Sequence, residues 1–220
     1  MTLRLARYQS LISRTEPLQL EGWIRGLLIH YFFHVSNRQM VEVVGGAPGQ
    51  PRMVNLLAPT VFKGQGRIRL APTTVFGWTA SPGSYGCSYL EARNPGAVIE
   101  IGERTTINNG AALIAEGAGI RIGARCLIGT EFQVLDTNAH ELPLGRRHLP
   151  DSRTAQVVVG DDVFIGSRVT LLKGCHISDG CVVAAGAVVP PGFVAPPLSI
   201  VAGNPARVVG AVPAAEPAET

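Results

Sequence analysis

The chain has 220 residues, of which 46% are hydrophobic and only 16% charged, and its formal net charge at pH 7 is +3. This length suits one domain with modest additions, and the apolar composition fits a continuous core or a large subunit interface. With so small a net charge and no long basic run, the composition argues against a nucleic-acid partner.

Residues 1–55 predict an N-terminal helical and extended segment. The stretch Gly22–Val35 is apolar, but it is too short and too interrupted by polar residues to span a membrane, so we expect a helix there. A second helix is expected over residues 2–13. Packing against the end of the main domain and peripheral contact with a membrane both remain open. His30 and His34 are four residues apart, but no further ligand accompanies them, so we expect no metal site.

A six-residue repeat dominates the rest of the chain. A period of six is typical of a parallel β-helix, in which each hexad is a short strand plus a turn and three hexads close one triangular coil. We expect the repeated aliphatic residues to point inward and the solenoid domain to span residues 56–210, with irregular early coils at Val61, Ile68 and Val75. The repeated aliphatic residues are Ile101, Ile107, Leu113, Ile122, Ile128, Val134, Val159, Ile165, Leu171, Ile177, Val183 and Val189. The fourth residue after many of them is small or β-branched: Thr105, Ala111, Cys126, Val163, Val169, Cys175, Cys181 and Ala187.

The repeat is interrupted at places where loops are expected. Nine residues instead of six separate Leu113 from Ile122, which predicts a wider turn near Gly117–Gly119. A larger gap over residues 140–156 predicts a loop thrown out from a coil. Residues 77–97 form a second loop-rich insertion, and residues 211–220 are expected to be a disordered tail.

The four cysteines predict core packing and no metal site or disulfide. Cys126, Cys175 and Cys181 occupy the small inward slot of their hexads, where a thiol acts as a small hydrophobe. Only Cys87 lies outside the repeat. No Cys-x-x-Cys pair occurs and no secretory signal is evident, so a reducing cytoplasm is the expected setting.

Three strings, together with the hexads, carry a resemblance to a known family. They are DTNAH at 136–140, VFIGSRVTLLKG at 163–174 and IVAGNPARVV at 200–209. In this order they resemble the hexapeptide-repeat acetyltransferases, closest to the maltose, nodulation-factor and streptogramin branch. That branch includes enzymes that modify cell-surface polysaccharides such as lipopolysaccharide. The resemblance covers roughly residues 60–210 and implies an all-β fold, a left-handed parallel β-helix, with a short N-terminal helical segment.

The resemblance also implies an activity: transfer of acetyl from acetyl-CoA to a hydroxyl of a saccharide or polysaccharide precursor. A hydroxyl attacks a thioester only when its proton is removed, and an imidazole, with an ordinary pKa of about 6.5, accepts that proton near neutral pH. This general base is assigned to His140. Attack is direct, without a covalent enzyme intermediate, and a backbone N–H stabilises the oxyanion. Asp136 either orients His140 or binds the acceptor.

Other candidate residues follow from the same resemblance. Asn108 and Asn109 bind the acceptor or merely form a turn, and Arg146 and Arg147 contact an anionic acceptor or lie in solvent. The cofactor groove is expected on the late coils, with backbone groups of small residues bonding the pantetheine amides and cations pairing with the phosphates of CoA. These cofactor-binding residues are Gly166, Ser167, Lys173, Ala185, Gly186 and Arg207.

The resemblance further implies a homotrimer in which His140 comes from one chain and part of the CoA groove from the next. His148 and His176 lack the ligand spacing of a zinc site, so no metal is expected. Two alternative functions remain open: an N-acetyltransferase acting on an amino-sugar nucleotide, and a non-catalytic β-helix scaffold. An amine acceptor needs less help from a base, and a scaffold does not bind CoA, so these alternatives are separable by assay.

Overall fold

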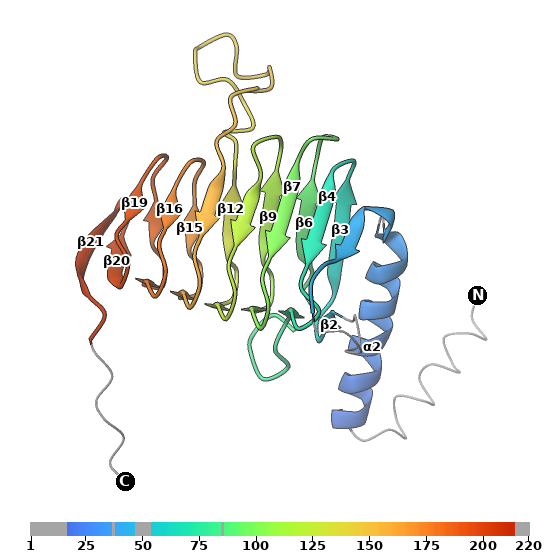
Figure 1. Ribbon diagram of the computed structural model, residues 1–220. Coiled ribbons are helices and arrows are strands. Elements are labelled where there is room, and N and C mark those ends of the chain that lie inside the picture. Colours follow the sequence, from blue (N-terminus) through green and yellow to red (C-terminus); the bar gives the residue numbers. More distant parts are fainter. Residues whose placement is uncertain (1–16, 37, 47–53, 85, 214–220) are drawn as a thin grey trace.

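The six-residue repeat folds into short strands separated by turns, and successive strands fall on three different sheets that wind round one axis (Figure 1). The computed structural model describes residues 17–36, 38–46, 54–84 and 86–213. Neighbouring strands within each sheet run parallel, except for a final antiparallel pair. The chain therefore forms a parallel β-helix of triangular cross-section, as the repeat predicts.

The three sheets are named here in the order in which the chain visits them. The first sheet contains β1 (Val41–Val43), β4 (Arg67–Leu70), β7 (Val98–Ile101), β10 (Ile120–Ile122), β13 (Val157–Val159), β16 (His176–Ile177) and β19 (Val194–Ala195). The second contains β2 (Asn55–Leu56), β5 (Val75–Phe76), β8 (Thr106–Ile107), β11 (Leu127–Ile128), β14 (Phe164–Ile165), β17 (Val182–Val183), β20 (Ser199–Gly203) and β21 (Ala206–Ala211). The third contains β3 (Thr60–Gly64), β6 (Ser88–Ala92), β9 (Ala112–Ala115), β12 (Gln133–Leu135), β15 (Thr170–Leu171) and β18 (Val188–Val189).

The core is a stack of the repeated aliphatic side chains. All twelve predicted inward residues are no more than 3% exposed, and the residues in the small slot are no more than 1% exposed. The ladder registers stack them directly, for example Ile101 on Ile122 and Ile122 on Val159. The repeat also continues past Val189, because Ala195 and Val201 are fully buried at the next two positions.

The first coil begins earlier than the repeat predicts. The strand Val41–Val43 already pairs in parallel with Ile68–Leu70, so the solenoid starts well before Leu56. The hexad pattern missed this strand because the link from β1 to β2 is much longer than a normal turn. At residue 75 the expected register is also off by one: Phe76 is fully buried, whereas Val75 is not.

The first insertion is shorter than expected. Residues 88–92 form β6 of the third sheet, paired with both β3 and β9, so only residues 77–87 leave the coil. Alternating burial along β6 confirms that it is an ordinary solenoid strand. Ala211, the first residue of the expected disordered tail, belongs to β21 and pairs with β20, and residues 214–220 lie outside the described residues.

The N-terminal helix lies beside the first coil (Figure 1). It is α2 (Pro17–Val35), followed by the short 3-10 helix η1 (Arg38–Met40). The Ser36 hydroxyl donates to the Phe32 carbonyl at 2.8 Å and accepts the Phe62 N–H at 3.0 Å, which ties the end of the helix to β3. The expected helix over residues 2–13 lies outside the described residues. No helix among the described ranges is long and apolar enough to cross a membrane.

The cysteines pack as predicted. Cys126, Cys175 and Cys181 are fully buried, and all four cysteines are free thiols. Burial raises the pKa of the Cys175 thiol to about 12, and burial also raises the pKa of the Cys126 and Cys181 thiols. These thiols are therefore neutral core groups.

Candidate active site

The loop predicted over residues 140–156 leaves the solenoid at the corner between the third and first sheets, and Figure 1 shows it projecting from the middle of the stack. It is a short hairpin. The Asp151 N–H donates to the Ala139 carbonyl and the Glu141 N–H to the Leu149 carbonyl, both at 3.1 Å, while His140 lies opposite Pro150. Ala139 turns the chain outward with φ at 64°. The imidazole of His140 thus stands at the base of a hairpin and not inside the coil.

A buried carboxylate anchors this hairpin. Asp151 is only 1% exposed, and its Oδ1 accepts the Arg153 guanidinium at 2.8 Å and the Arg153 N–H at 3.0 Å. Its Oδ2 accepts the Asn138 amide at 3.1 Å and lies 3.4 Å from Lys173 Nζ. The hydrogen bonds from Arg153 and Asn138 hold the pKa of the Asp151 carboxyl well below its usual range. The anchor therefore stays charged at neutral pH.

Asp136 holds a turn of the preceding coil. Its Oδ1 accepts the Glu116 N–H at 2.7 Å, and its Oδ2 accepts those of Gly117 at 3.0 Å and Gly119 at 2.8 Å. This is the wide turn predicted from the nine-residue gap. The carboxylate is fully buried and makes no hydrogen bond to His140. These contacts give Asp136 a structural role in this turn.

His140 itself is exposed, and its imidazole makes no hydrogen bond to any residue that the structure describes. Further along the hairpin, Arg146 donates to Glu141 at 3.0 Å and Arg147 to the Leu142 carbonyl at 3.2 Å. Both arginines therefore have partners within the loop. The hairpin also carries apolar side chains in solvent: Leu142 is 65% exposed and Leu144 88%. Solvent-exposed leucine side chains on a projecting loop are typical of a surface that contacts another chain.

The two predicted asparagines lie at a different corner, between the second and third sheets. Asn109 is buried: its Oδ1 accepts the Trp78 N–H at 3.0 Å, and its Nδ2 donates to the carbonyls of Trp78, Ser81 and Pro82 at 2.9, 3.2 and 3.0 Å. Asn108 accepts the Asn109 N–H and donates to the Ser81 hydroxyl. Asn109 therefore holds the 77–87 loop, and the structure does not bring it beside His140 of the same chain.

Four predicted cofactor residues share that second–third corner on two successive coils. The N–H groups of Ser167 and Ala185 donate to no described residue, which leaves two peptide donors open one coil apart. Gly186 has φ at 74° and open space where a side chain would be. Gly166 differs, because a Cβ there would lie 2.5 Å from the Ala185 nitrogen, so this glycine serves the stacking of coils. The corner offers backbone donors and room for an extended ligand.

The two cations expected at the CoA phosphates, Lys173 and Arg207, do not lie together. Lys173 follows β15 at the third–first corner, where its Nζ donates to the Arg153 carbonyl at 2.8 Å and pairs with Asp151. Only 17% of its side chain is exposed, so the structure gives Lys173 an anchoring role at the hairpin. Arg207 lies on β21, is exposed, and its Nη1 donates to the Ala206 carbonyl at 2.8 Å.

Sequence reasoning missed the anchor formed by Asp151 and Arg153. A signal was present, because Asp151 follows Pro150 near the point where the chain must return to the coil, and a short polar side chain there is suited to bind turn amides. Within the described part of the chain, no group of three or more His, Cys, Asp or Glu side chains is arranged to hold a metal ion.

Comparison with known proteins agrees with the repeat. Residues 156–191 match the family model described as bacterial transferase hexapeptide (six repeats). A polysialic acid O-acetyltransferase of Neisseria meningitidis is 31% identical over 76 residues, which are 34% of this chain and 35% of that protein. The chain thus matches about a third of the length of this relative.

Solved structures establish the fold. A maltose O-acetyltransferase from Clostridium difficile 630 aligns over 92% of this chain and 91% of its own at 21% identity, with a TM-score of 0.52. A hexapeptide-repeat acetyltransferase from Vibrio cholerae, solved with acetyl coenzyme A, aligns over 91% and 92% at 22% identity, also with a TM-score of 0.52. The resemblance found in the sequence is confirmed, and the solenoid is a left-handed parallel β-helix.

Proposed function

We propose that this chain, a left-handed β-helix carrying the bacterial transferase hexapeptide repeat, is an acetyl-CoA-dependent acetyltransferase that acylates a hydroxyl of a saccharide or polysaccharide precursor. One observation carries the proposal: the imidazole of His140, which has no hydrogen-bond partner among the described residues, stands at the base of a hairpin whose ends are fixed by two buried carboxylates. The similarity to a polysialic acid O-acetyltransferase supports a saccharide hydroxyl as acceptor.

In this mechanism His140 acts as general base. Its imidazole takes the proton of the acceptor hydroxyl while the oxygen attacks the thioester carbonyl of acetyl-CoA. The carbon–sulfur bond then breaks, the imidazolium returns its proton to the leaving sulfur, and the products are the acetyl ester and the thiol of CoA. A general base of this kind contributes about 10²–10⁴ in rate. The rigid base of the hairpin favours the reaction, because it holds the imidazole in one place.

The cofactor is assigned to the second–third corner. The open N–H groups of Ser167 and Ala185 are suited to the amide carbonyls of pantetheine, and Gly186 leaves space for the chain to pass. Arg207 is the proposed phosphate partner, because it is exposed and pairs with no carboxylate among the described residues. Each charge-assisted contact with a phosphate contributes about 1.5–3 kcal/mol.

These assignments favour a trimer with shared sites. His140 and the proposed cofactor groove lie at different corners of the triangular coil. Within one chain, the width of the third sheet therefore separates the base from the groove. A second copy that brings its third–first corner to this groove closes the gap. The exposed Leu142 and Leu144 on the hairpin give that contact an apolar surface to bury.

The test is a screen of acceptors that reads release of the free CoA thiol. Oligosaccharides with free hydroxyls and amino-sugar nucleotides are offered in parallel, with product analysis for esters and amides. Ester formation on a saccharide supports the proposal, and exclusive amide formation assigns the chain to N-acetylation. Failure to bind acetyl-CoA in titration calorimetry would leave the solenoid as a scaffold.

A mixing experiment tests the shared site. His140→Ala removes the base, and Ala185→Glu places an exposed carboxylate in the proposed groove, where it repels the phosphates of CoA. If sites form between chains, mixed trimers of the two inactive variants regain part of the activity, because some sites combine two intact halves. If every site lies within one chain, the mixture stays as inactive as its components.

A further inference from the structure

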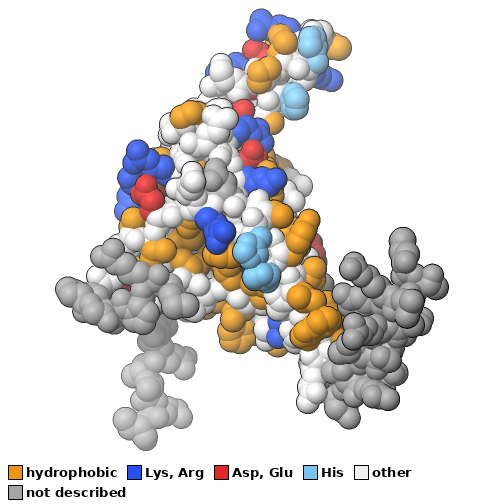
Figure 2. All heavy atoms as spheres, turned by 90° about the vertical axis from the view of Figure 1, so that its right-hand side faces the viewer, with side chains coloured by type: hydrophobic (Ala, Val, Ile, Leu, Met, Phe, Trp, Pro, Cys, Tyr) orange, Lys and Arg blue, Asp and Glu red, His pale blue; other side chains and the backbone are white. Residues whose placement is uncertain are grey.

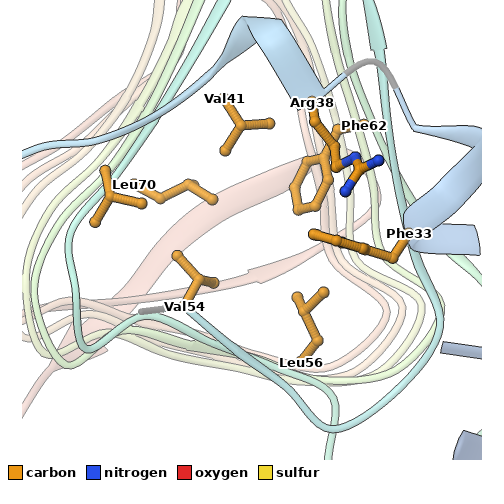
Figure 3. Close-up of a pocket in the computed structure, with 8 residues that line it drawn as sticks. Phe33, Arg38, Val41, Val54, Leu56, Phe62 and Leu70 are labelled. Carbon is orange, nitrogen blue, oxygen red and sulfur yellow. The ribbon is translucent and has the colours of Figure 1, made fainter. Parts of the chain in front are cut away.

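The N-terminal mouth of the solenoid is apolar. Strands β1, β2 and β3 are the end strands of their sheets, so their inward side chains have no preceding coil to pack against. A cavity of about 320 Å³ remains there, and Figure 3 shows its lining side chains around the interior of the first coil. The lining consists of Phe33, Arg38, Val41, Val43, Val54, Leu56, Phe62 and Leu70.

One positive charge stands at this apolar mouth. The guanidinium of Arg38 lies 4.9 Å from the centroid of the Phe33 ring, and Figure 3 shows the two side chains next to each other. Arg38 is exposed and forms no ion pair with any described carboxylate. The site thus combines an apolar cavity with a cation that pairs with no carboxylate among the described residues.

The neighbouring helix presents an apolar face to solvent. Trp23, Leu27, Tyr31 and Val35 recur every four residues, which places them along one side of α2. They are 50%, 48%, 60% and 44% exposed. Figure 2, which looks onto this end of the molecule, shows hydrophobic side chains gathered there. Helices of globular proteins normally bury such a stripe, so we expect a binding partner to cover this face.

The charge pattern favours an anionic lipid surface as that partner. Tryptophan and tyrosine are the residues preferred at the boundary between headgroups and acyl chains. The sequence just before α2 adds Arg4, Arg7 and Arg14 against a single acid, Glu16. Basic residues close in sequence to exposed aromatic side chains favour contact with the anionic headgroups of a membrane.

We propose that the N-terminal end of this protein docks on an anionic lipid bilayer. Trp23, Leu27 and Tyr31 enter the boundary between headgroups and acyl chains. Arg38 pairs with a lipid phosphate, and the cavity beside it accepts a segment of the acyl chain of that lipid. The candidate active site lies on later coils of the same solenoid, so this contact leaves the hairpin and the second–third corner free.

The experiment is co-sedimentation of the full chain with vesicles. Phosphatidylcholine vesicles are compared with vesicles that also contain phosphatidylglycerol. We expect the protein to pellet with the anionic vesicles, and the bound fraction to fall as salt is raised, because surface charges are screened. A combined Trp23→Ser, Leu27→Ser and Tyr31→Ser variant should lose at least about tenfold in partitioning. Arg38→Gln should lose about fivefold, on anionic vesicles alone.

The matched control is Val194→Ser, which removes an equally exposed apolar side chain from β19, a late coil. It should bind vesicles like the unchanged protein, and the circular dichroism of all variants should be the same. Binding by the triple variant equal to that of the control would overturn the proposal. A wild type that ignores anionic vesicles, while the triple variant alters the oligomeric state, would also overturn it and assign the stripe to a second copy of the chain.

Discussion

The carboxylate of Asp136 accepts the N–H of Gly119 at 2.8 Å, across two successive coils. Glu116 and Gly117 donate to the same carboxylate, so three peptide groups of one turn depend on one side chain. The turn needs this support because Gly119 has φ at 96° and a Cβ at this position would lie 2.8 Å from the Val98 carbonyl. The residue at the start of the DTNAH string is thus explained by backbone hydrogen bonding.

Asp136→Asn should destabilise the fold. Asparagine keeps one acceptor oxygen and places an NH₂ group against buried N–H donors, so at least one peptide donor loses its partner. We expect the free energy of unfolding to fall by about 2–4 kcal/mol in denaturant titration. Asp179→Asn is the control, since that exposed carboxylate accepts the N–H of Asp161 at 2.8 Å. If both substitutions lowered the free energy of unfolding equally, the proposed role of Asp136 in holding the turn would be contradicted.

His140→Ala should fold and assemble normally, because the side chain is exposed and contacts no described partner by hydrogen bond. Turnover should fall by about 10²–10⁴, while the affinity for acetyl-CoA measured by calorimetry stays the same. His148→Ala removes an exposed imidazole elsewhere on the same hairpin and should retain activity. A His140→Ala protein with near-normal turnover on its acceptor contradicts the mechanism.

Arg207→Ala and Lys173→Ala should differ in kind. Arg207 is proposed to bind a phosphate of CoA, so its loss should weaken acetyl-CoA affinity by roughly tenfold or more with little change in saturated turnover. Lys173 holds Asp151 and the Arg153 carbonyl, so its loss should loosen the hairpin and lower turnover while affinity is kept. Calorimetry and steady-state kinetics separate the two. A large loss of acetyl-CoA affinity in Lys173→Ala would return this lysine to the phosphate role expected from sequence.

The stabilisation provided by Asp151 should depend on pH with a defined sign. The native pKa of this carboxyl is lowered, chiefly by the Arg153 guanidinium, so the unfolded chain binds its proton more readily. The stability difference between the wild type and Asp151→Asn should therefore be constant above the unfolded pKa of about 4. It should shrink as pH falls from there through the lowered native pKa. Urea titrations of both proteins over acidic pH measure this difference; a difference that grows on acidification would contradict the anchor.

The thiols should react in a fixed order. Cys87 is partly exposed, whereas Cys126, Cys175 and Cys181 are buried, and burial raises the pKa of all four thiols. Under native conditions at pH 8 we expect a disulfide reagent to label Cys87 alone, and the other three only after denaturant is added. Mass spectrometry of the labelled peptides reads the order. Prompt native labelling of Cys175 would show that the coil is not closed around it.

Periodicity explains what the sequence could predict. The six-residue spacing alone predicts that side chains such as those of Ile165 and Leu171 point into the core, because each coil repeats the same three-sided environment. Position 140 was singled out for the same reason, since an imidazole stands where an aliphatic residue is due, and its role as general base stays a prediction. The place of β1 in the first coil escaped prediction, because the chain between Val43 and Asn55 keeps no six-residue spacing.

Contacts between different coils could not be read from the sequence. Asn109 binds a loop 27–31 residues earlier, and Lys173 binds a carboxylate 22 residues before it. Nothing in the residue types marks these pairs, because an asparagine near a glycine and a lysine in a turn have ordinary local explanations. Residue type singled out Asp136 and Lys173, but only the structure shows their long-range hydrogen bonds to the turn at 116–119 and to Asp151.

The hairpin is fastened to three coils at once: to the preceding one through Asp136, to its own, and to the following one through Lys173. In a solenoid each coil touches only its neighbours, so thermal opening begins as fraying at the ends and moves inward. The hairpin is fastened across the central coils and is therefore protected from that fraying. Loss of the C-terminal coil then removes Arg207, the proposed phosphate partner on β21, before it disturbs His140, so partial opening of the stack weakens the proposed cofactor site first.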